Sequence, residues 1–453
     1  MKQSAYAWAY GEVLHPAWER VVRKRPIRRY VSLLRQTQWL GPDRLARLQG
    51  EELRNLLVNA GSRVPYYREL FTRSRFDPRA VTSRDDLAAL PILTRETLRE
   101  RCDELVDETD RDRPIRKQTS GSTGVPLRFE YSNRSETWRQ ATRLRAYEWA
   151  GYRPGLVTLH YWGTGTHVPR GVEALKIRLD RVLRRDLYVD CGHQDEADMR
   201  ELARLIERKK PHAIVAYTRA LAAFARWVVE SGSRAWEDIP VICGAEAMAP
   251  AHRDWLVRAF GKRVFETYGA RETMLIAAEC DAHDGLHVAE ENLVVEIVRD
   301  DGRPAEPGET GAVVVTDLHN GRMPMVRYAN GDRATWGPAR ACLCGRTLRR
   351  IARVDGRVND TMRTASGVRV PGMLFISLLN GHAAEIREFQ ALQRRSGAVD
   401  LFVVPGPSWS NARFESTARR LEAYFDGFPL RVTLVDSIAR DASGKWRPVV
   451  VEQ

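Results

Sequence analysis

Two glycines and four hydroxyl side chains make up a short segment whose residue types could bind phosphate. The segment is Thr119-Ser120-Gly121-Ser122-Thr123-Gly124, and it follows the basic pair Arg116-Lys117 closely. Glycine lets backbone N–H groups approach an anion, and serine and threonine hydroxyls add further donors. The composition suits a triphosphate, although ordinary loops can have the same composition. It is not a Walker loop, because no Gly-Lys-Ser/Thr sequence follows.

The elements around this segment alternate between short apolar runs and helical patterns. The expected strands are 157–162, 213–217, 240–243 and 263–268, and the expected helices are 135–150, 195–210, 218–230 and 251–260. Such alternation predicts an α/β fold with a largely parallel sheet. Ligands of these sheets bind beyond the carboxyl ends of the strands. We therefore expect Gly244-Ala245-Glu246 and Tyr268-Gly269-Ala270-Arg271-Glu272 to lie on one rim.

The pattern divides the chain into three parts. Residues 1–115 are expected to be mostly helical, and residues 116–359 to form the core of a large domain. From about residue 286 the core changes to hairpin-like strands, 293–298 and 312–316, which predict a small β subdomain. Residues 360–453 are expected to form a small α+β domain with helix 383–395, strand 399–404, helix 411–425 and strand 430–435.

Apolar residues recur at roughly helical spacing near the N-terminus, just before a basic cluster. They are Trp8, Val13, Leu14, Trp18, Val21 and Val22. One interpretation is a basic amphipathic helix that touches membranes. We favour the alternative, a helix that packs on its own domain with an exposed basic edge.

Composition points to a globular enzyme. The chain has 453 residues, 43% of them hydrophobic, and 12 tryptophans, so it can bury sizeable cores. The net charge of +13 would fit a nucleic-acid-binding protein, but the arginines are dispersed and alternate with acids, which indicates solvated helix faces. We expect no membrane span and no signal peptide, and six cysteines in so long a chain favour a reducing cytoplasm.

Six segments follow one another in a fixed order that resembles a known superfamily. They are the loop 119–124, Gly244-Ala245-Glu246, Tyr268 to Glu272, Gly331-Asp332, Gly356-Arg357 with Asp360, and Ser443-Gly444-Lys445. This order is similar to the adenylate-forming superfamily of acyl-CoA synthetases, peptide-synthetase adenylation domains and luciferases. Pro324 to Asp332 and Cys342 to Thr347 resemble, more closely, the phenylacetate–CoA ligases with their coenzyme F390 synthetase and capsule-associated relatives.

The resemblance implies an AMP-forming ligase. ATP would activate a carboxylic acid as its acyl adenylate, with release of pyrophosphate, and the acyl group would then pass to coenzyme A. The loop 119–124 would hold the β- and γ-phosphates, and Glu272 would bind Mg²⁺, a hard cation that prefers carboxylate oxygen. Lys445 would bridge the attacking carboxylate and the α-phosphate as a catalytic residue. Asp360 would be the hinge about which the small domain turns.

The same resemblance implies which residues bind the nucleoside and which bind the acid. Gly244-Ala245-Glu246 with Thr267, Tyr268 and Gly269 would border the adenine, while Asp332 and Arg357 would bind the ribose, Arg357 with the phosphate as a further candidate ligand. The acid pocket is expected between Tyr161-Trp162, Tyr217 and the segment Gly269-Ala270. Its aromatic residues would suit an aryl or arylacetic acid, although such residues also simply fill cores.

Three cysteines and a histidine flank the expected β subdomain and could form a structural zinc site. They are Cys280, His287, Cys342 and Cys344, and thiolates with imidazole are the preferred ligands of zinc. Relatives often carry such residues at these places, but reduced, buried cysteines remain the alternative.

Other acceptors of the acyl group and other classes of protein are alternatives at this point. The activated acid could pass to an amine or a carrier protein, or the acid could be unusual, such as nitrite. A non-catalytic relative is disfavoured by the presence of Glu272, Asp332 and Lys445. A homodimer is expected only because relatives commonly form one.

Overall fold

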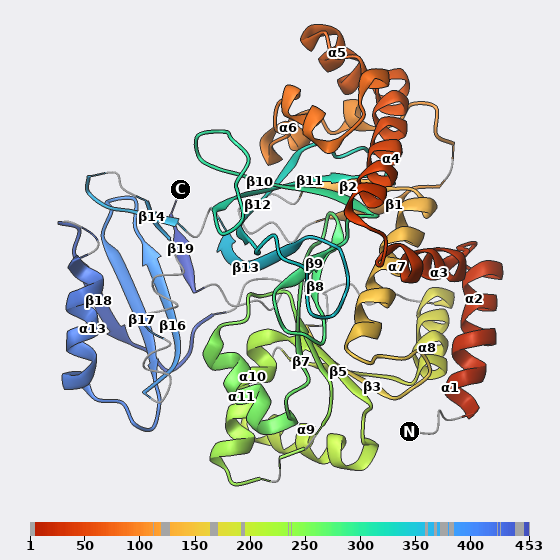
Figure 1. Cartoon of the computed structure of the whole chain (residues 1–453). Coiled ribbons are helices and arrows are strands. Elements are labelled where there is room, and N and C mark those ends of the chain that lie inside the picture. The colour runs from red at the N-terminus through yellow and green to blue at the C-terminus, as the bar shows by residue number, and fades with distance from the viewer. Residues whose placement is uncertain are drawn as a thin grey trace.

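The computed structural model describes most of the chain. It covers residues 5–452 except 112, 119–126, 164–170, 192–194, 234, 237, 358–360, 367–368, 372–378, 380–384, 424, 426 and 440–447. Figure 1 shows a large body and, beside it, a smaller C-terminal module drawn in blue. Within the described ranges, no helix combines the length and apolarity needed to cross a bilayer.

The N-terminal part is mostly helical, as predicted. Its helices are α1 Ala5–Ala9, the π-helix η1 Tyr10–Leu14, α2 His15–Val21, α3 Ile27–Thr37, α4 Pro42–Arg63, α5 Pro65–Ser74, the 3₁₀ turns η2 Pro78–Ala80, η3 Arg84–Ala89 and η4 Asp103–Leu105, and α6 Arg95–Glu100. Proline at the first position of α4 and α5 fits a site where no N–H is needed.

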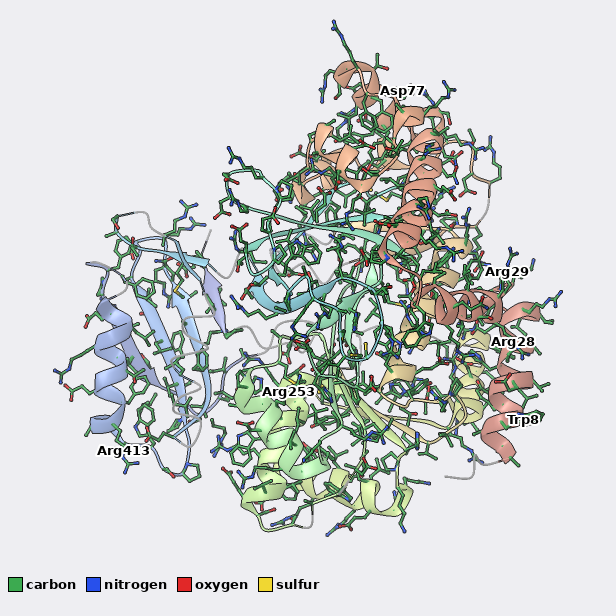
Figure 2. The ribbon with its side chains drawn as sticks, viewed as in Figure 1. Trp8, Arg28, Arg29, Asp77, Arg253 and Arg413 are labelled. Atoms are coloured by element: carbon green, nitrogen blue, oxygen red, sulfur yellow. The ribbon has the colours of Figure 1, made fainter. Side chains whose placement is uncertain are left out.

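The apolar stripe expected on the first helices is turned outward. Trp8 and Val21 are 55% and 74% exposed, whereas Tyr10, His15 and Glu19 are buried against the body. Figure 2 shows Trp8 of α1 and Arg28 and Arg29 of α3 projecting from the body. The helices pack on their own domain, as we favoured, but through a different face from the one that the apolar spacing suggested.

One sheet of eleven strands runs through the body. Its strands are β3 Thr158–Trp162, β4 Asp186–Asp190, β5 Ala213–Tyr217, β6 Val241–Gly244, β7 Val264–Ala270, β8 Met274–Glu279, β9 Leu286–Val288, β10 Leu293–Val298, β11 Thr310–Asp317, β12 Tyr328–Trp336 and β13 Arg350–Arg357. They lie in the order β10-β11-β12-β13-β9-β8-β7-β6-β5-β3-β4. The strands from β4 to β7 pair in parallel, and those from β7 to β10 pair antiparallel.

The parallel half confirms the predicted alternation of strands and helices. Its helices are α7 Asn133–Trp149, α8 Val172–Arg184, α9 Glu196–Lys209, α10 Thr218–Glu230 and α11 Pro250–Phe260. Helices α9 to α11 pack on one face of the sheet, and α3 with α7 packs on the other. The sequence analysis assigned neither α8 nor the edge strand β4. The strands expected to form a β subdomain continue the same sheet, and their status as a separate unit stays a prediction.

The C-terminal module corrects one prediction. It contains β14 Thr361–Arg363, β15 Arg369–Pro371, β16 Ile386–Gln393, β17 Val399–Pro405, α13 Asn411–Ala423, β18 Leu430–Leu434 and β19 Val449–Val451. The helix predicted over 383–395 is wrong, because 386–393 is a strand. Good helix formers fill this stretch, but Phe389, Ala391 and Gln393 are buried in alternation and pair with β17, so tertiary context overrides propensity.

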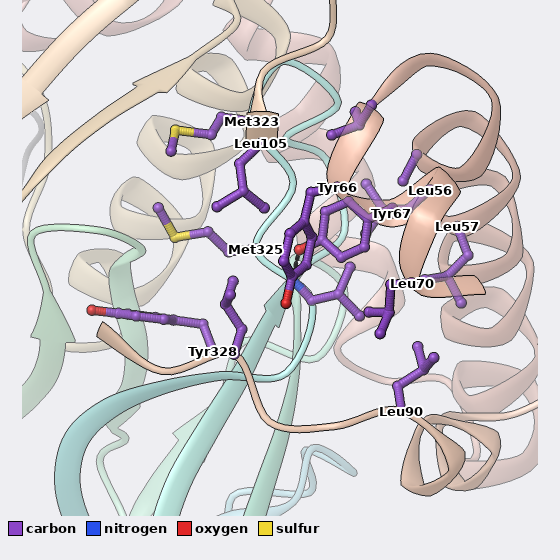
Figure 3. Close-up of a cluster of buried hydrophobic side chains, with 14 of the residues drawn as sticks. Leu56, Leu57, Tyr66, Tyr67, Leu70, Leu90, Leu105, Met323, Met325 and Tyr328 are labelled. Carbon is purple, nitrogen blue, oxygen red and sulfur yellow. Dashed lines mark hydrogen bonds between the residues drawn. The ribbon is translucent and has the colours of Figure 1, made fainter. Parts of the chain in front are cut away.

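A buried cluster connects the N-terminal helices to the antiparallel strands (Figure 3). Tyr67 of α5 donates a hydrogen bond to the carbonyl of Pro324 at 2.8 Å and accepts one from the backbone of Val326 at 3.1 Å. Leu127 and Phe129, around the start of β2 Arg128–Tyr131, are buried in the same cluster. The cluster therefore anchors the hairpin that β2 forms with β1 Ile115–Gln118.

Candidate active site

The predicted phosphate loop connects two paired strands. Residues 119–124 lie outside the described residues, but their flanks are described: Gln118 of β1 pairs with Arg128 of β2. The guanidinium of Arg271 donates a hydrogen bond to the carbonyl of Gln118 at 3.2 Å. The entrance of the loop is therefore joined to the β7–β8 turn, next to Glu272.

Glu272 is a buried acid in that turn, with 6% of its surface exposed. The hydroxyl of Tyr328 donates to its Oε1 at 3.2 Å. Arg139 of α7, whose side chain is fully buried, donates to the carbonyl of Glu272 at 2.5 Å and to Oδ2 of Asp317 at 2.5 Å. Sequence reasoning missed Arg139, because an arginine inside an arginine-rich helix gives no sign that it will be buried.

A second group of predicted residues lies where β5 and β6 end. Thr218 Oγ1 donates to the carbonyls of Gly244 and Glu246, at 3.3 and 2.9 Å. The carboxylate of Glu246 accepts the N–H of Arg219 at 3.1 Å, in the first turn of α10. Ala245 between them has φ of 69°, a left-handed conformation that is uncommon for a residue with a Cβ.

Close packing explains the glycine that ends β6. A Cβ on Gly244 would lie 2.7 Å from Oγ1 of Thr267, whose hydroxyl donates to the carbonyl of Cys243 at 2.7 Å. The indole of Trp162 would be 3.8 Å from the same Cβ. Gly244 therefore leaves space at the rim between Thr267 and Trp162.

Asp332 of β12 belongs to a buried network that includes Tyr268 of β7. Tyr268 donates its hydroxyl hydrogen to Oδ2 of Asp332 at 2.8 Å. Asn330 donates from Nδ2 both to the Tyr268 hydroxyl and to Asp332, at 2.8 and 2.9 Å. Arg357 pairs with Asp332 across β12 and β13, although its side chain lies outside the description. Asn330 was not predicted as a site residue, and its spacing of two from Asp332 on one strand face was the available signal.

Gly269 marks an irregularity in β7. The register with β8 shifts between Tyr268 and Gly269. A Cβ on Gly269 would lie 1.9 Å from the carbonyl oxygen of Met274, so only glycine allows the two backbones to approach this closely. The bulge places Tyr268 toward Asp332, while Ala270 ends the strand.

The three aromatic residues predicted for the acid pocket share one cluster beneath α9 to α11. The rings of Trp162 and Tyr217 are 4.3 Å apart between centroids, at the carboxyl ends of β3 and β5. Tyr161 and Tyr217 are buried in that cluster, and Trp162 contacts it as well as the cluster on the other face of the sheet. Trp162 and Tyr217, next to Gly244, form the aromatic part of the rim.

Two residues predicted for catalysis and domain motion, Lys445 and Asp360, lie outside the described residues.

One acid at the rim has a shifted pKa. Burial raises the pKa of Glu266 to about 7, although the N–H of Met248, which donates to its Oε1 at 3.0 Å, favours the charged form. Glu266 precedes Thr267 on β7, and its hydrogen bond holds the segment after Glu246 against the sheet.

The four predicted zinc ligands come together. The ligand atoms of Cys280, His287, Cys342 and Cys344 lie within 4.8 Å of one another. Burial lowers the pKa of His287 to about 4, which keeps the imidazole neutral, and its Nδ1 lies 3.0 Å from the carbonyl of Leu348. Burial opposes ionisation of Cys344, but hydrogen bonds from Arg346, whose N–H lies 3.4 Å away, and from the thiols of Cys342 and Cys280 together lower the pKa of that thiol.

Comparisons with known proteins identify relatives of this chain. Residues 189–322 match the AMP-binding enzyme family. A phenylacetate-coenzyme A ligase of Thermus thermophilus is 28% identical over 378 residues, which are 81% of this chain and 82% of that protein.

Two solved structures of 2-hydroxyisobutyryl-CoA ligase share the fold. The structure in the postadenylation state, with an acyl-AMP bound, has a TM-score of 0.72 at 19% identity and covers 92% of this chain and 91% of the other. The structure in the thioesterification state, with 2-HIB-AMP and CoA, has a TM-score of 0.60 at 20% identity and covers 91% of each chain.

Proposed function

Because the chain belongs to the adenylate-forming superfamily, we propose that it activates a carboxylic acid with ATP and then transfers the acyl group to coenzyme A. In the first step a carboxylate oxygen attacks the α-phosphorus, and pyrophosphate leaves. In the second step the thiol sulfur attacks the acyl carbon, AMP leaves, and the thiol proton passes to solvent. The phenylacetate-coenzyme A ligases similar to this chain support an aromatic acid.

One observation carries the proposal. Segments that are far apart in the sequence meet at a single rim: the loop entrance at Gln118, the turn at Glu272, the end of β6 at Gly244, and the network around Asp332. This rim lies at the carboxyl ends of parallel strands, where α/β sheets bind ligands. The segments provide, in one place, groups suited to phosphates, a cation and a nucleoside.

The Asp332 network suits the ribose. An ionised carboxylate accepts hydrogen bonds from two neighbouring hydroxyls, and such charge-assisted bonds are strong. Tyr268 and Asn330 donate to Oδ2 of Asp332, so they hold the carboxylate in one orientation before a ligand binds. Arg357, on the paired strand, is the proposed cationic neighbour of the ribose or phosphate.

Glu272 is the proposed magnesium ligand. The ion would supply charge neutralisation for the phosphates when bound. Tyr328 orients one carboxylate oxygen, and Arg139 fixes the backbone of the same residue, so the acid is held beside the loop entrance. A buried carboxylate next to a phosphate-binding loop has the chemistry that a hard cation requires.

The roles of Lys445 and Asp360 rest on the resemblance alone. We propose that Lys445 stabilises the negative charge that develops between the carboxylate and the α-phosphate, and that Asp360 is the hinge of the C-terminal module. In the structure this module contacts the body where Arg226 of α10 donates to the carbonyl of Ile386, at 3.4 Å.

The cysteine and histidine cluster fits structural zinc. Zinc–sulfur bonds of about 2.3 Å place two tetrahedral sulfur ligands about 3.8 Å apart. Cys280 and Cys342 have their sulfur atoms 3.7 Å apart, and Cys344 lies 3.3 Å from Nε2 of His287. The carbonyl of Leu348 would orient the imidazole through Nδ1. All six cysteines are free thiols, which supports a reducing compartment such as the cytoplasm.

Pyrophosphate release tests the proposed reaction. The protein is incubated with ATP, Mg²⁺ and a panel of aryl, fatty and amino acids, with and without coenzyme A. We expect release that depends on a particular acid, and faster turnover when coenzyme A removes the adenylate. Absence of release with every acid, despite measurable ATP binding, would contradict the proposed function.

A further inference from the structure

A polar cavity lies behind Trp162, on the side of the sheet covered by α7. Its volume is about 290 Å³, near the lower end of the range of small-molecule sites, about 300–1,000 Å³. Its walls include Arg143, Tyr147, His160, Trp162, Arg184 and Tyr188. We refer to this cavity as the β3–β4 chamber, because His160 and Tyr188 pair across these two strands to form its floor.

Trp162 connects the chamber to the rim of the proposed active site. Its indole lines the chamber, contacts the Tyr217 ring at 4.3 Å, and lies next to Gly244. One side chain thus separates the place where the acid would react from a polar space behind it. An acid longer than the rim can hold would extend past Trp162 into this chamber.

Most of the charge in the chamber is paired. Arg25 is 2.6 Å from a carboxylate oxygen of Glu19, and Arg184 is 3.1 Å from one of Asp180. Arg23 shares Asp180 at 3.1 Å. These groups balance each other and therefore leave little capacity to bind a further ion.

Arg143 is the exception. Among the described residues, no acid lies within ion-pairing distance of its half-buried guanidinium. It donates to Oε1 of Gln140 at 3.0 Å and lies over the ring of Tyr147 at 5.3 Å. When a guanidinium is removed from water, a negatively charged acceptor stabilises it more than an amide oxygen does. The chamber therefore presents one cation that a ligand can pair.

The β3–β4 side of the chamber carries two buried polar atoms without hydrogen-bond partners in the described structure. They are Nε2 of His160 and Oδ1 of Asp186, 3.3 Å apart without the geometry of a hydrogen bond. His160 stacks on Tyr188, with centroids 4.5 Å apart. Buried polar atoms are normally satisfied, so these two indicate a place where a polar ligand group or water completes the bonding.

We propose that the substrate is a dicarboxylic acid whose second carboxylate enters the chamber and pairs with Arg143. The inference rests on the proposed acid activation, because it places the reacting carboxylate at the rim. One unpaired guanidinium can neutralise one carboxylate in a bidentate ion pair. A phosphate dianion would keep one negative charge without a cationic partner, close to the carboxylate of Asp186. The Trp162 and Tyr217 rings would hold the apolar or aromatic body between the two carboxylates.

Matched acids test the proposal. The ratio of kcat/KM for a dicarboxylic acid to that for the monocarboxylic acid of the same skeleton is measured by pyrophosphate release, for example with hexanedioate and hexanoate or with benzene-1,4-dicarboxylate and benzoate. In the unchanged protein we expect a ratio above about 10, and Arg143→Gln should lower it by about 10- to 100-fold, as expected for loss of a charged hydrogen bond. Arg143→Lys keeps the positive charge but loses the two parallel N–H donors of the guanidinium, so it should lower the ratio less.

Arg134→Gln is the control, because Arg134 lies on the same helix, is exposed and contacts Glu52 outside the chamber. This variant should keep the ratio. A preference for monocarboxylic acids, or a ratio that Arg143→Gln and Arg143→Lys leave unchanged, would overturn the proposal while acid activation stands.

Calorimetric binding of the diacid separates the two claims. We expect binding to the unchanged protein and weaker binding to the Arg143 variants. Such binding without pyrophosphate release from any acid would support the chamber and refute the proposed function. No diacid binding and no diacid turnover would refute the chamber.

Discussion

Asp332 shows how neighbouring residues orient the side chain of a proposed ligand-binding residue. Its carboxylate is buried, and two donors, Tyr268 and Asn330, fix one oxygen at 2.8 and 2.9 Å. Holding a carboxylate before a ligand arrives reduces the ordering cost of binding. Tyr268 and Asn330 therefore orient the side chain of Asp332, and the proposed ribose site depends on all three residues.

Replacing Asp332 with asparagine should weaken the use of ATP. The substitution preserves shape but removes the charge that strengthens hydrogen bonds to ribose hydroxyls, which contribute about 1.5–3 kcal/mol each when charged. We expect kcat/KM for ATP to fall by about 10- to 100-fold, measured by pyrophosphate release at a saturating acid concentration. Asp301→Asn, at an exposed turn, serves as the control. Equal effects of the two substitutions would contradict the assignment of Asp332.

Glu266 should make stability depend on pH. Burial raises its pKa from 4.5 to about 7, so the folded protein binds this proton more tightly than the unfolded chain does. The stabilisation is complete below about pH 4.5 and is lost as the pH rises through 7. Glu266→Gln should therefore stabilise the protein at pH 8 by about 3 kcal/mol and have little effect near pH 4.5. Urea unfolding at both pH values measures this, and an equal effect at both would show that the shift is absent.

The β7–β8 hairpin is the element that positions Tyr268 and Glu272 together. Its bulge at Gly269 depends on the absence of a Cβ, which would lie 1.9 Å from the Met274 carbonyl oxygen. Gly269→Ala should destabilise the fold by about 1–3 kcal/mol, as overpacking does, and should lower activity further by displacing Tyr268. Gly321→Ala, where a Cβ meets nothing within 4 Å, is the matched control. Thermal unfolding that is the same for both variants would contradict this account.

The strands β8, β9 and β13 and the segment before β13 should be held together by zinc. Cys344→Ser should reduce bound zinc from about one ion per chain to nearly none, because a closed structural site needs all four ligands. Cys102→Ser, outside the cluster, should retain the metal. Metal analysis of the purified proteins measures the zinc bound per chain. A zinc-free protein with intact cysteines would contradict the proposal.

Many of the helices and strands could be predicted from the sequence. The strands of the parallel half and helices such as Thr218–Glu230 follow apolar periodicity, and the structure has them within a few residues. Ile386–Gln393 was predicted as a helix, since its composition favours helix and only pairing with β17 makes it a strand. Arg139 could not be found either, because burial of a charge depends on partners from distant segments such as Asp317.

At the scale of the whole molecule, one sheet unites the site. Its parallel half contributes Gly244, and its antiparallel half contributes Asp332, with Tyr268 on the strand that joins them. The C-terminal module lies beside this body, with a contact at α10 (Figure 1). The fold is more similar to the postadenylation structure of 2-hydroxyisobutyryl-CoA ligase than to its thioesterification structure.

Acid-dependent exchange of labelled pyrophosphate into ATP tests the central claim most directly, because it reports reversible adenylate formation without coenzyme A. We predict exchange that requires the acid and Mg²⁺, proceeds without coenzyme A, and falls by at least about 100-fold in Lys445→Ala, as expected when charge stabilisation in the transition state is removed. No exchange with any acid, under conditions where ATP binds, would contradict the assignment of this site to adenylate formation.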